Sequence, residues 1–205
     1  MKPRLLLVLV ALLTIAVPGK ASADAIGILQ QISPIPTNYA LGAGFDFVPF
    51  YLSGLGDVTA NIFAVDITLP PDPVPNTSTS GCEAADFAGF PVGSIALLQR
   101  GTCMFELKVA NAAAAGAVGV LVFNEGQPGR TDAINGTLGS LALVPAAFTS
   151  FGVGVELYNL WLTGGVVVRL AVTDNTQPAA VPEPATLTLL GLGLGAAALR
   201  RRRTR

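Results

Sequence analysis

Two stretches decide the fold, Gly93-Ser-Ile-Ala-Leu-Leu-Gln-Arg-Gly-Thr-Cys103 and Ala115-Gly-Ala-Val-Gly-Val-Leu-Val-Phe-Asn124. Each contains a short apolar run, at residues 94–99 and 118–123, of the length and composition typical of a buried strand. The first run stops at Arg100-Gly101, and a helical pattern separates it from the second. The sequence therefore predicts a strand, a helix and another strand in succession.

The helix expected between these strands has one apolar face, because its apolar residues recur at i, i+4, i+7 and i+8. They are Phe105, Val109, Ala112 and Ala113, with Gly116 placed to end the helix. Small residues at Ala112, Ala113 and Ala115 would let this helix approach the sheet closely. A second helix is predicted from the same spacing of Val153, Leu157, Leu160 and Trp161, with Ser150 as N-cap and Gly164-Gly165 as its end.

Four further strand-like runs lie at residues 45–50, 57–66, 142–149 and 165–173. Most are separated by clusters of Gly, Pro, Asn or Ser, and residues 70–80 are predicted to form a surface loop. The predicted fold class is therefore α+β, a β-rich domain with two main helices.

The residues around the two opening stretches are Gly81, Cys82, Asp86, Phe87, Phe105, Lys108, Asn111 and Ala112, followed later by Leu143-Val-Pro-Ala-Ala. In this order and spacing, over roughly residues 45–173, the chain resembles a protease-associated (PA) domain. The resemblance implies a β-rich sandwich or open barrel flanked by the two helices. In larger proteins such domains accompany a peptidase, and in sorting receptors they contribute to ligand binding. The resemblance thus implies an architecture more than a site.

The N-terminus is typical of a secretory signal peptide. Lys2 and Arg4 stand at its start, an apolar run covers residues 5–17, and Pro18-Gly19 follows. Small residues Ala21 and Ala23 occupy the −3 and −1 positions of a signal peptidase site, so cleavage is predicted after Ala23. A retained N-terminal anchor is the alternative, although it would need a longer apolar run.

The C-terminus combines three features in order: Val181-Pro182-Glu183-Pro184, an apolar stretch at 185–199, and the cluster Arg200, Arg201, Arg202 and Arg203. A helix over the apolar stretch would reach about 22 Å against a hydrocarbon core of about 30 Å, so it is a marginal transmembrane span. The arginines would hold this end on the cytoplasmic side. These features resemble the PEP-CTERM sorting signal. The resemblance implies a Gram-negative organism, transient inner-membrane anchoring, processing by exosortase, and delivery to the cell surface or extracellular matrix. A plain tail anchor is the alternative.

Five parts are therefore expected along the chain. They are a signal peptide with its helix at 1–23, an N-terminal segment at 24–44, a PA-like domain at 45–173, a linker with the PEP motif at 174–184, and a sorting tail with a short transmembrane helix at 185–205.

The exported part becomes acidic once both ends are removed. Of the 12 basic residues, eight lie in the two ends, so four remain against 13 acids and the net charge is about −9. That balance argues against nucleic acid as a partner. The chain has no histidine, which excludes Ser-His-Asp and Cys-His nucleophilic sites and every histidine-containing zinc site. No enzymatic activity, catalytic residue, metal or cofactor is predicted.

Cys82 and Cys103 both lie in the exported part, where oxidation is expected. A bridge between them would close a loop of about 22 residues and contribute roughly 3 kcal/mol in the chain-entropy model. A disulfide is therefore favoured over a reactive or metal-binding thiol. Lys108 is the one lysine left after processing and thus the one lysine base for a serine nucleophile, but beside the packed helix face a solvated or structural role is expected.

The candidate binding residues lie in two loops. Arg100, at a strand-to-helix turn, could hold a carboxylate through two hydrogen bonds, and internal pairing with Glu83 or Asp86 is the favoured alternative. The loop at 124–132 contributes Asn124, Glu125, Arg130 and Asp132. The acid pairs Glu83/Asp86 and Glu125/Asp132 could form a calcium site or a retained acid pair. Neither has a recognised ligand spacing, so surface solvation is favoured for both.

The leading functional hypothesis is a non-catalytic module that binds an unknown protein or peptide at the cell surface. A structural component of the surface matrix, with a polysaccharide partner, is the alternative. A small hydrolase is less favoured because the chain has no histidine. An accessory to a separately encoded peptidase is also less favoured.

Overall fold

The computed structural model describes residues 26–173. Its elements are β1 (Ile26–Ser33), β2 (Thr37–Asn38), β3 (Phe47–Pro49), β4 (Gly56–Ala64), the 3-10 helix η1 (Ala84–Phe87), β5 (Ile95–Gln99), α2 (Phe105–Ala114), β6 (Gly119–Phe123), β7 (Ala146–Thr149), α3 (Phe151–Thr163) and β8 (Val167–Thr173). The expected signal peptide, its cleavage site, the PEP linker, the sorting motif and the C-terminal transmembrane helix lie outside these residues.

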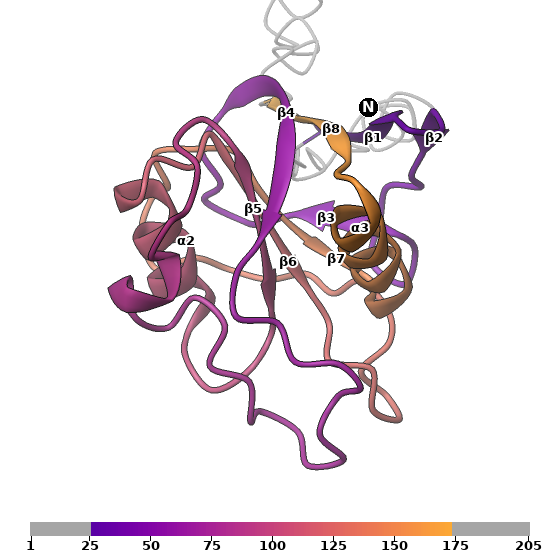
Figure 1. Cartoon of the computed structure of the whole chain (residues 1–205), viewed down its shortest axis with the longest axis vertical. Coiled ribbons are helices and arrows are strands. Elements are labelled where there is room, and N and C mark those ends of the chain that lie inside the picture. Colours follow the sequence, from indigo (N-terminus) through magenta and orange to yellow (C-terminus); the bar gives the residue numbers. More distant parts are fainter. Residues whose placement is uncertain (1–25, 174–205) are drawn as a thin grey trace, which may run out of the picture. The chain divides into compact units, whose positions relative to one another are not determined.

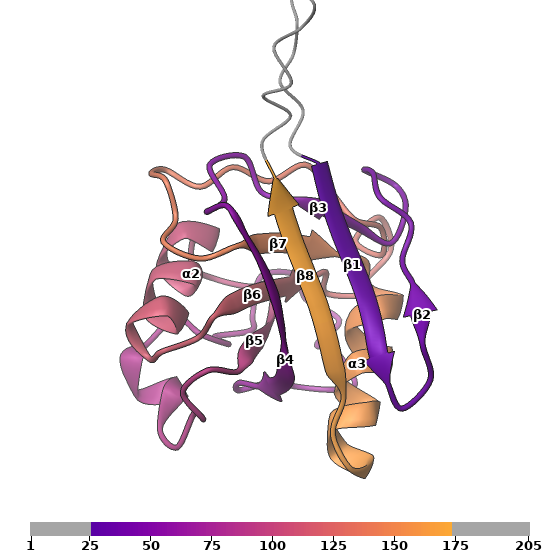
Figure 2. The same ribbon diagram turned by 90° about the horizontal axis from the view of Figure 1, so that it is seen from above.

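All eight strands join one sheet, in the order β2-β1-β8-β4-β5-β6-β7-β3. Strands β4 to β7 run parallel to one another, and the flanking pairs are antiparallel. Strand β4 belongs to both parts, because residues 56–61 pair with β8 and residues 62–64 pair with β5. At β4 the sheet turns into an open half-barrel, and Figure 2 shows β4, β8 and β1 lying side by side.

The two predicted helices cover opposite faces of the sheet, as Figure 1 shows. Strands β5 and β6 are buried at every residue, as their apolar runs predict. Their alternate side chains enter two separate cores: Ile95 and Leu97 join Leu157 of α3, whereas Ala96 and Leu98 join Val109 of α2. The strand-helix-strand pattern therefore builds the centre of the domain.

The helix ends follow the predicted signals. Ser150 Oγ accepts a hydrogen bond from the Val153 N–H at 3.3 Å, which confirms it as the N-cap of α3. Gly116 follows α2 with φ of 90°, a left-handed conformation that favours glycine. Within α3, a Cβ at Gly154 would collide with the Phe123 ring, so the helix lies directly against β6. Glycine is therefore needed at this contact.

Strand β1 is not predicted from the sequence, although it pairs along its length with β8. Its isoleucines Ile26 and Ile28 are exposed, while Gln31 is buried on the opposite face. Gln31 is satisfied there, because its Nε2 donates to the Ile35 carbonyl at 2.7 Å and its Oε1 accepts from Tyr39 Oη–H at 3.2 Å. The buried face thus carries a glutamine where the alternation rule expects an apolar residue. The segment expected at 24–44 thus adds a strand to the sheet.

The ends of the described region meet, since Ile26 and Thr173 are register partners in β1 and β8. Residues 24–175 form one compact unit that contains both hydrophobic cores and the disulfide described below. The unit thus has hydrophobic cores and a covalent cross-link of its own. Within residues 26–173, neither α2 nor α3 combines the length and apolar character that a membrane crossing needs.

Candidate functional site

The site is built where two neighbouring parallel strands end. Arg100 directly follows β5 and Asn124 directly follows β6, so both side chains lie at the carboxyl edge of the parallel strands, where open α/β sheets usually bind ligands. Arg100 Nη1 donates to Asn124 Oδ1 at 3.3 Å. Asn124 is buried, and its Nδ2 donates to the Asp132 carbonyl at 2.8 Å. The Asn124 side chain therefore holds Arg100 through its Oδ1 and connects it to the 124–132 loop through its Nδ2.

The turn after Arg100 depends on glycine. A Cβ at Gly101 would collide with the carbonyl oxygen of Ser78, and the next residue, Thr102, donates its backbone N–H to the same oxygen at 2.9 Å. The loop at residues 66–83 therefore crosses the Arg100-Gly101 turn at a distance that no side chain permits. This crossing brings Asn76 to the site.

Glu125 and Arg130 form an ion pair that joins the two loops. Glu125 is 2% exposed, and its Oε2 accepts from Arg130 Nη1 at 2.6 Å while its Oε1 accepts from the Asn76 N–H at 2.6 Å. Arg130 also donates to Asn76 Oδ1 at 2.8 Å. Surface solvation is therefore wrong for Glu125, whose two oxygens both have partners. Asp132 is exposed, and the site uses its backbone carbonyl.

Within the described residues, Arg100 has no carboxylate partner. The ion pairs within residues 26–173 are Arg130–Glu125 and Arg169–Asp57. The expected pairing of Arg100 with Glu83 or Asp86 is wrong, because Asp86 Oδ2 instead accepts the Glu83 N–H at 3.0 Å in the cap of η1. Burial lowers the pKa of Arg100, the positive charge of Arg130 lowers this pKa further, and Glu125 opposes the shift.

A cleft of about 420 Å³ opens beside Arg100. Its other lining residues come from the 66–83 loop, the start of α2 and the stretch before β7: Asn76, Gly101, Cys103, Met104, Phe105, Glu106, Thr137, Leu138 and Gly139. Sequence reasoning missed Asn76, Met104, Thr137 and Leu138 as site residues. Of these, Asn76 alone carried a signal in the sequence, because asparagine directly after proline favours a turn. In the structure Asn76 adopts the left-handed φ of 58° that such turns use.

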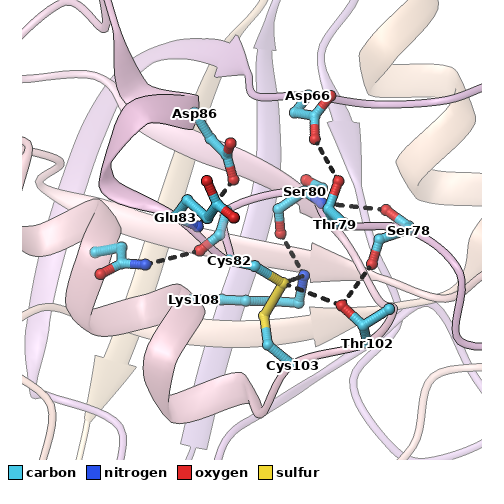
Figure 3. Close-up of a disulfide and its surroundings, with 12 residues drawn as sticks. Asp66, Ser78, Thr79, Ser80, Cys82, Glu83, Asp86, Thr102, Cys103 and Lys108 are labelled. Carbon is cyan, nitrogen blue, oxygen red and sulfur yellow. Dashed lines mark hydrogen bonds between the residues drawn. A yellow bond between two sulfur atoms is a disulfide. The ribbon is translucent and has the colours of Figure 1, made fainter.

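The predicted disulfide between Cys82 and Cys103 is present, with the two Cα atoms 5.8 Å apart. Figure 3 shows Lys108 beside it. Lys108 is fully buried; its Nζ donates to the Ser80 carbonyl and lies 3.7 Å from Cys82 Sγ. Desolvation lowers the pKa of Lys108 to about 8, while Asp86, Asp66 and Glu125 act to raise it. The solvated alternative for Lys108 is therefore wrong, and its role is structural.

The Ser80 hydroxyl is also committed to the fold. Its Oγ donates to the Val65 carbonyl at 2.6 Å and accepts the Gln99 N–H at 2.9 Å, and the residue is fully buried. Lys108 and Ser80 thus hold the 66–83 loop against β5 and α2. Within the described ranges, no group of three or more cysteine, aspartate or glutamate side chains is placed to hold a metal ion.

Comparison with known families identifies the class of this domain. The sequence profile of the PA domain matches residues 64–157. The described fold contains a PA domain, as its sequence resemblance predicts. In this chain the domain is joined to a PEP-CTERM protein-sorting motif, whose profile matches residues 180–203. That motif implies processing by exosortase and points to an exported protein of a Gram-negative bacterium.

Among curated proteins, an aminopeptidase of Pseudomonas aeruginosa strain UCBPP-PA14 is 46% identical over 132 residues, which cover 63% of this chain and 24% of the aminopeptidase. Leucine aminopeptidase 2 of Arthroderma otae is 38% identical over 94 residues, covering 45% of this chain and 18% of that protein. The chain thus spans about a quarter or less of the length of these relatives.

Two solved structures share the fold. The aminopeptidase from Aneurinibacillus sp. strain AM-1 has a TM-score of 0.53 at 24% identity, covering 75% of this chain and 34% of that one. The zinc aminopeptidase BSAP from Bacillus subtilis has a TM-score of 0.52 at 18% identity, covering 75% and 31%.

Proposed function

We propose that this PA domain is a non-catalytic module that binds a carboxylate-bearing segment of a protein or peptide at the cell surface or in the extracellular matrix. The observation that carries the proposal is Arg100, a half-buried guanidinium that opens onto a cleft and has no carboxylate partner within residues 26–173. Its hydrogen bond goes to the neutral amide of Asn124. A carboxylate ligand would supply the missing charge.

The geometry around Arg100 suits an anion. The guanidinium offers several N–H donors in a planar fork that matches a carboxylate, and one of them is occupied by Asn124. Arg130 adds a second positive charge that lowers the pKa of Arg100, and its own ion pair with Glu125 leaves Arg100 as the free charge of the two. An anion in the cleft would interact favourably with the Arg100 guanidinium. The remaining cleft lining offers Thr137 and Asn76 as hydrogen-bonding side chains and includes one carboxylate, that of Glu106.

The non-catalytic part of the proposal rests on the chemistry of the chain. The chain contains no histidine. The one lysine in the domain, Lys108, is fully buried and donates to a backbone carbonyl. Ser80, near that lysine, is equally buried, so a substrate has no route to either group. A serine–lysine hydrolase would need both groups to be accessible.

A role beside a separately encoded peptidase is the second candidate, because the relatives that match this domain are aminopeptidases. In that case the bound carboxylate would belong to a peptidase or to its substrate. A purely structural matrix role would instead predict a polysaccharide partner.

The test uses residues 24–175 as immobilised bait against the surface fraction of the organism, in wild type, Arg100→Ala and Arg169→Ala forms. Arg169→Ala is the matched control, because it removes the same charge at an exposed ion pair with Asp57. We expect a defined protein to be recovered, and its affinity, measured by interferometry, to fall at least tenfold in Arg100→Ala alone. Equal binding by Arg100→Ala would refute the proposed site. Recovery of polysaccharide would select the matrix role, and recovery of a peptidase the accessory role.

A further inference from the structure

An apolar groove of about 270 Å³ lies next to the cleft. It runs between α2 and the stretch at residues 138–143, with the buried Val109 and Leu138 among its lining residues. The same Glu106 and Leu138 line both the groove and the cleft of Arg100. The two hollows are therefore adjacent, with Glu106 and Leu138 between them.

The composition of the groove explains why it stays open. On the α2 side three of the lining residues are alanines, Ala110, Ala113 and Ala114, which leave space where larger residues would fill it. Ala113 is predicted from its spacing to face the sheet, but it is half-exposed here and lines the groove. Across from the helix stand Leu141 and Leu143, which are 68% and 90% exposed. Large apolar side chains at the rim of a hollow are typical of a binding surface.

We propose that this groove is a second subsite of the same peptide-binding surface, and that it takes an aliphatic or aromatic side chain of the bound segment. The inference rests on the proposed function, since the carboxylate held by Arg100 sets where the segment begins. The occupant is an extended peptide because an apolar groove lies beside the cleft onto which the unpaired Arg100 opens, and one chain carrying an acidic and an apolar side chain complements both.

Glu106 lies at the boundary between the two hollows and restricts which ligand residues can pass between them. Its Oε1 accepts a hydrogen bond from Ser140 Oγ at 2.7 Å, which holds the carboxylate at this boundary. An acidic residue of the ligand passing Glu106 would be repelled, whereas a neutral or basic residue would be accepted. The preferred ligand therefore has a neutral or basic residue between an acidic residue and an apolar one, in either chain direction.

The experiment measures binding of residues 24–175 to acetylated, amidated heptapeptide pools with one fixed central Asp and every other position, before and after it, scanned in turn. We expect Leu, Ile or Phe to be favoured over Ser about tenfold at one of those positions, the effect of burying one such side chain. Ala110→Trp, which fills the groove, and Leu143→Ser, which removes its rim, should abolish that preference and keep the preference for Asp. Val92→Ser is the matched control, because Val92 is 82% exposed and lies outside the groove.

The outcomes separate the two proposals. Loss of the Asp preference in Arg100→Ala with an intact apolar preference supports both subsites. A wild type that selects Asp but shows no apolar preference, or an apolar preference that both groove variants leave unchanged, refutes the groove and retains the proposed function. A wild type without Asp selection refutes the proposed function itself. If the wild type sediments as a dimer that Leu143→Ser dissociates, the groove is an interface between copies of this chain and the inference is wrong.

Discussion

Two cations eight residues apart, Arg100 and Lys108, lie in opposite environments in this domain. Neither forms an ion pair within residues 26–173. Lys108 is fully buried, and its ammonium group is held by the Ser80 carbonyl beside the disulfide. Arg100 is held by a neutral amide at the edge of the sheet and opens onto a cleft. The comparison teaches that access to solvent, more than charge or a missing ion pair, separates the residue proposed to bind a ligand from the one that supports the fold.

Replacing Lys108, the buried cation, should produce the largest change in the free energy of unfolding. Lys108→Ala leaves a cavity beside the disulfide and takes the donor from the Ser80 carbonyl, so we expect the free energy of unfolding to fall by about 4 kcal/mol. Urea denaturation followed by circular dichroism measures this change. Arg169→Ala, at an exposed ion pair, serves as control and should leave the midpoint nearly unchanged. A Lys108→Ala protein as stable as the control would mean that Lys108 does not anchor the 66–83 loop.

The pH dependence of stability should show an intermediate effect. In the folded state the pKa of Lys108 is lowered to about 8 from the ordinary 10.5, so between these values the unfolded state binds more protons. Stability contributed by this group therefore rises with pH in that window, by about 1.5 kcal/mol between pH 8 and 9.5. Denaturation of wild type and Lys108→Met at both pH values measures it, and the rise should be missing from the variant. The same rise in both proteins would assign it to other groups.

Replacing Arg100, the solvent-accessible cation, should have the smallest effect on the free energy of unfolding. Arg100→Ala takes away one hydrogen bond to Asn124 at a solvent-accessible position, so we expect the free energy of unfolding to change by less than about 1 kcal/mol. The same denaturation experiment reports it. A loss as large as that of Lys108→Ala would show that Arg100 is a structural residue, and the contrast between the two cations would disappear.

The central part of the fold could be predicted because its signals are local. The apolar runs of β5 and β6, the alanine-rich face of α2 and the Ser150 cap are each recognisable within a few residues. Strand β1 could not be found in this way, because its pairing with β8 joins residues far apart in sequence and places Gln31 on the buried face. The hydrogen bonds that make this burial tolerable come from Ile35 and Tyr39, which no local pattern connects to the strand.

The site could be predicted in part. Arg100, Asn124, Glu125 and Arg130 do converge, because β5 and β6 are parallel neighbours and end at the same edge. The sequence could not distinguish which arginine is free, since this depends on Asn76 arriving from a loop about 50 residues before Glu125. The sequence also could not show that Lys108 is buried, because the Ser80 carbonyl that accepts its hydrogen bond lies 28 residues earlier in the chain.

The pairing of Ile26 with Thr173 has a consequence for how the domain can be connected to other chains. Both ends of the described region leave at one corner of the sheet, beside the start of β4, whereas Arg100 and Asn124 lie at the far ends of strands parallel to β4. A domain with adjacent ends can be inserted into a host protein or tethered from one side without strain. The point of attachment and the cleft are at opposite ends of the same sheet, so neither obstructs the other.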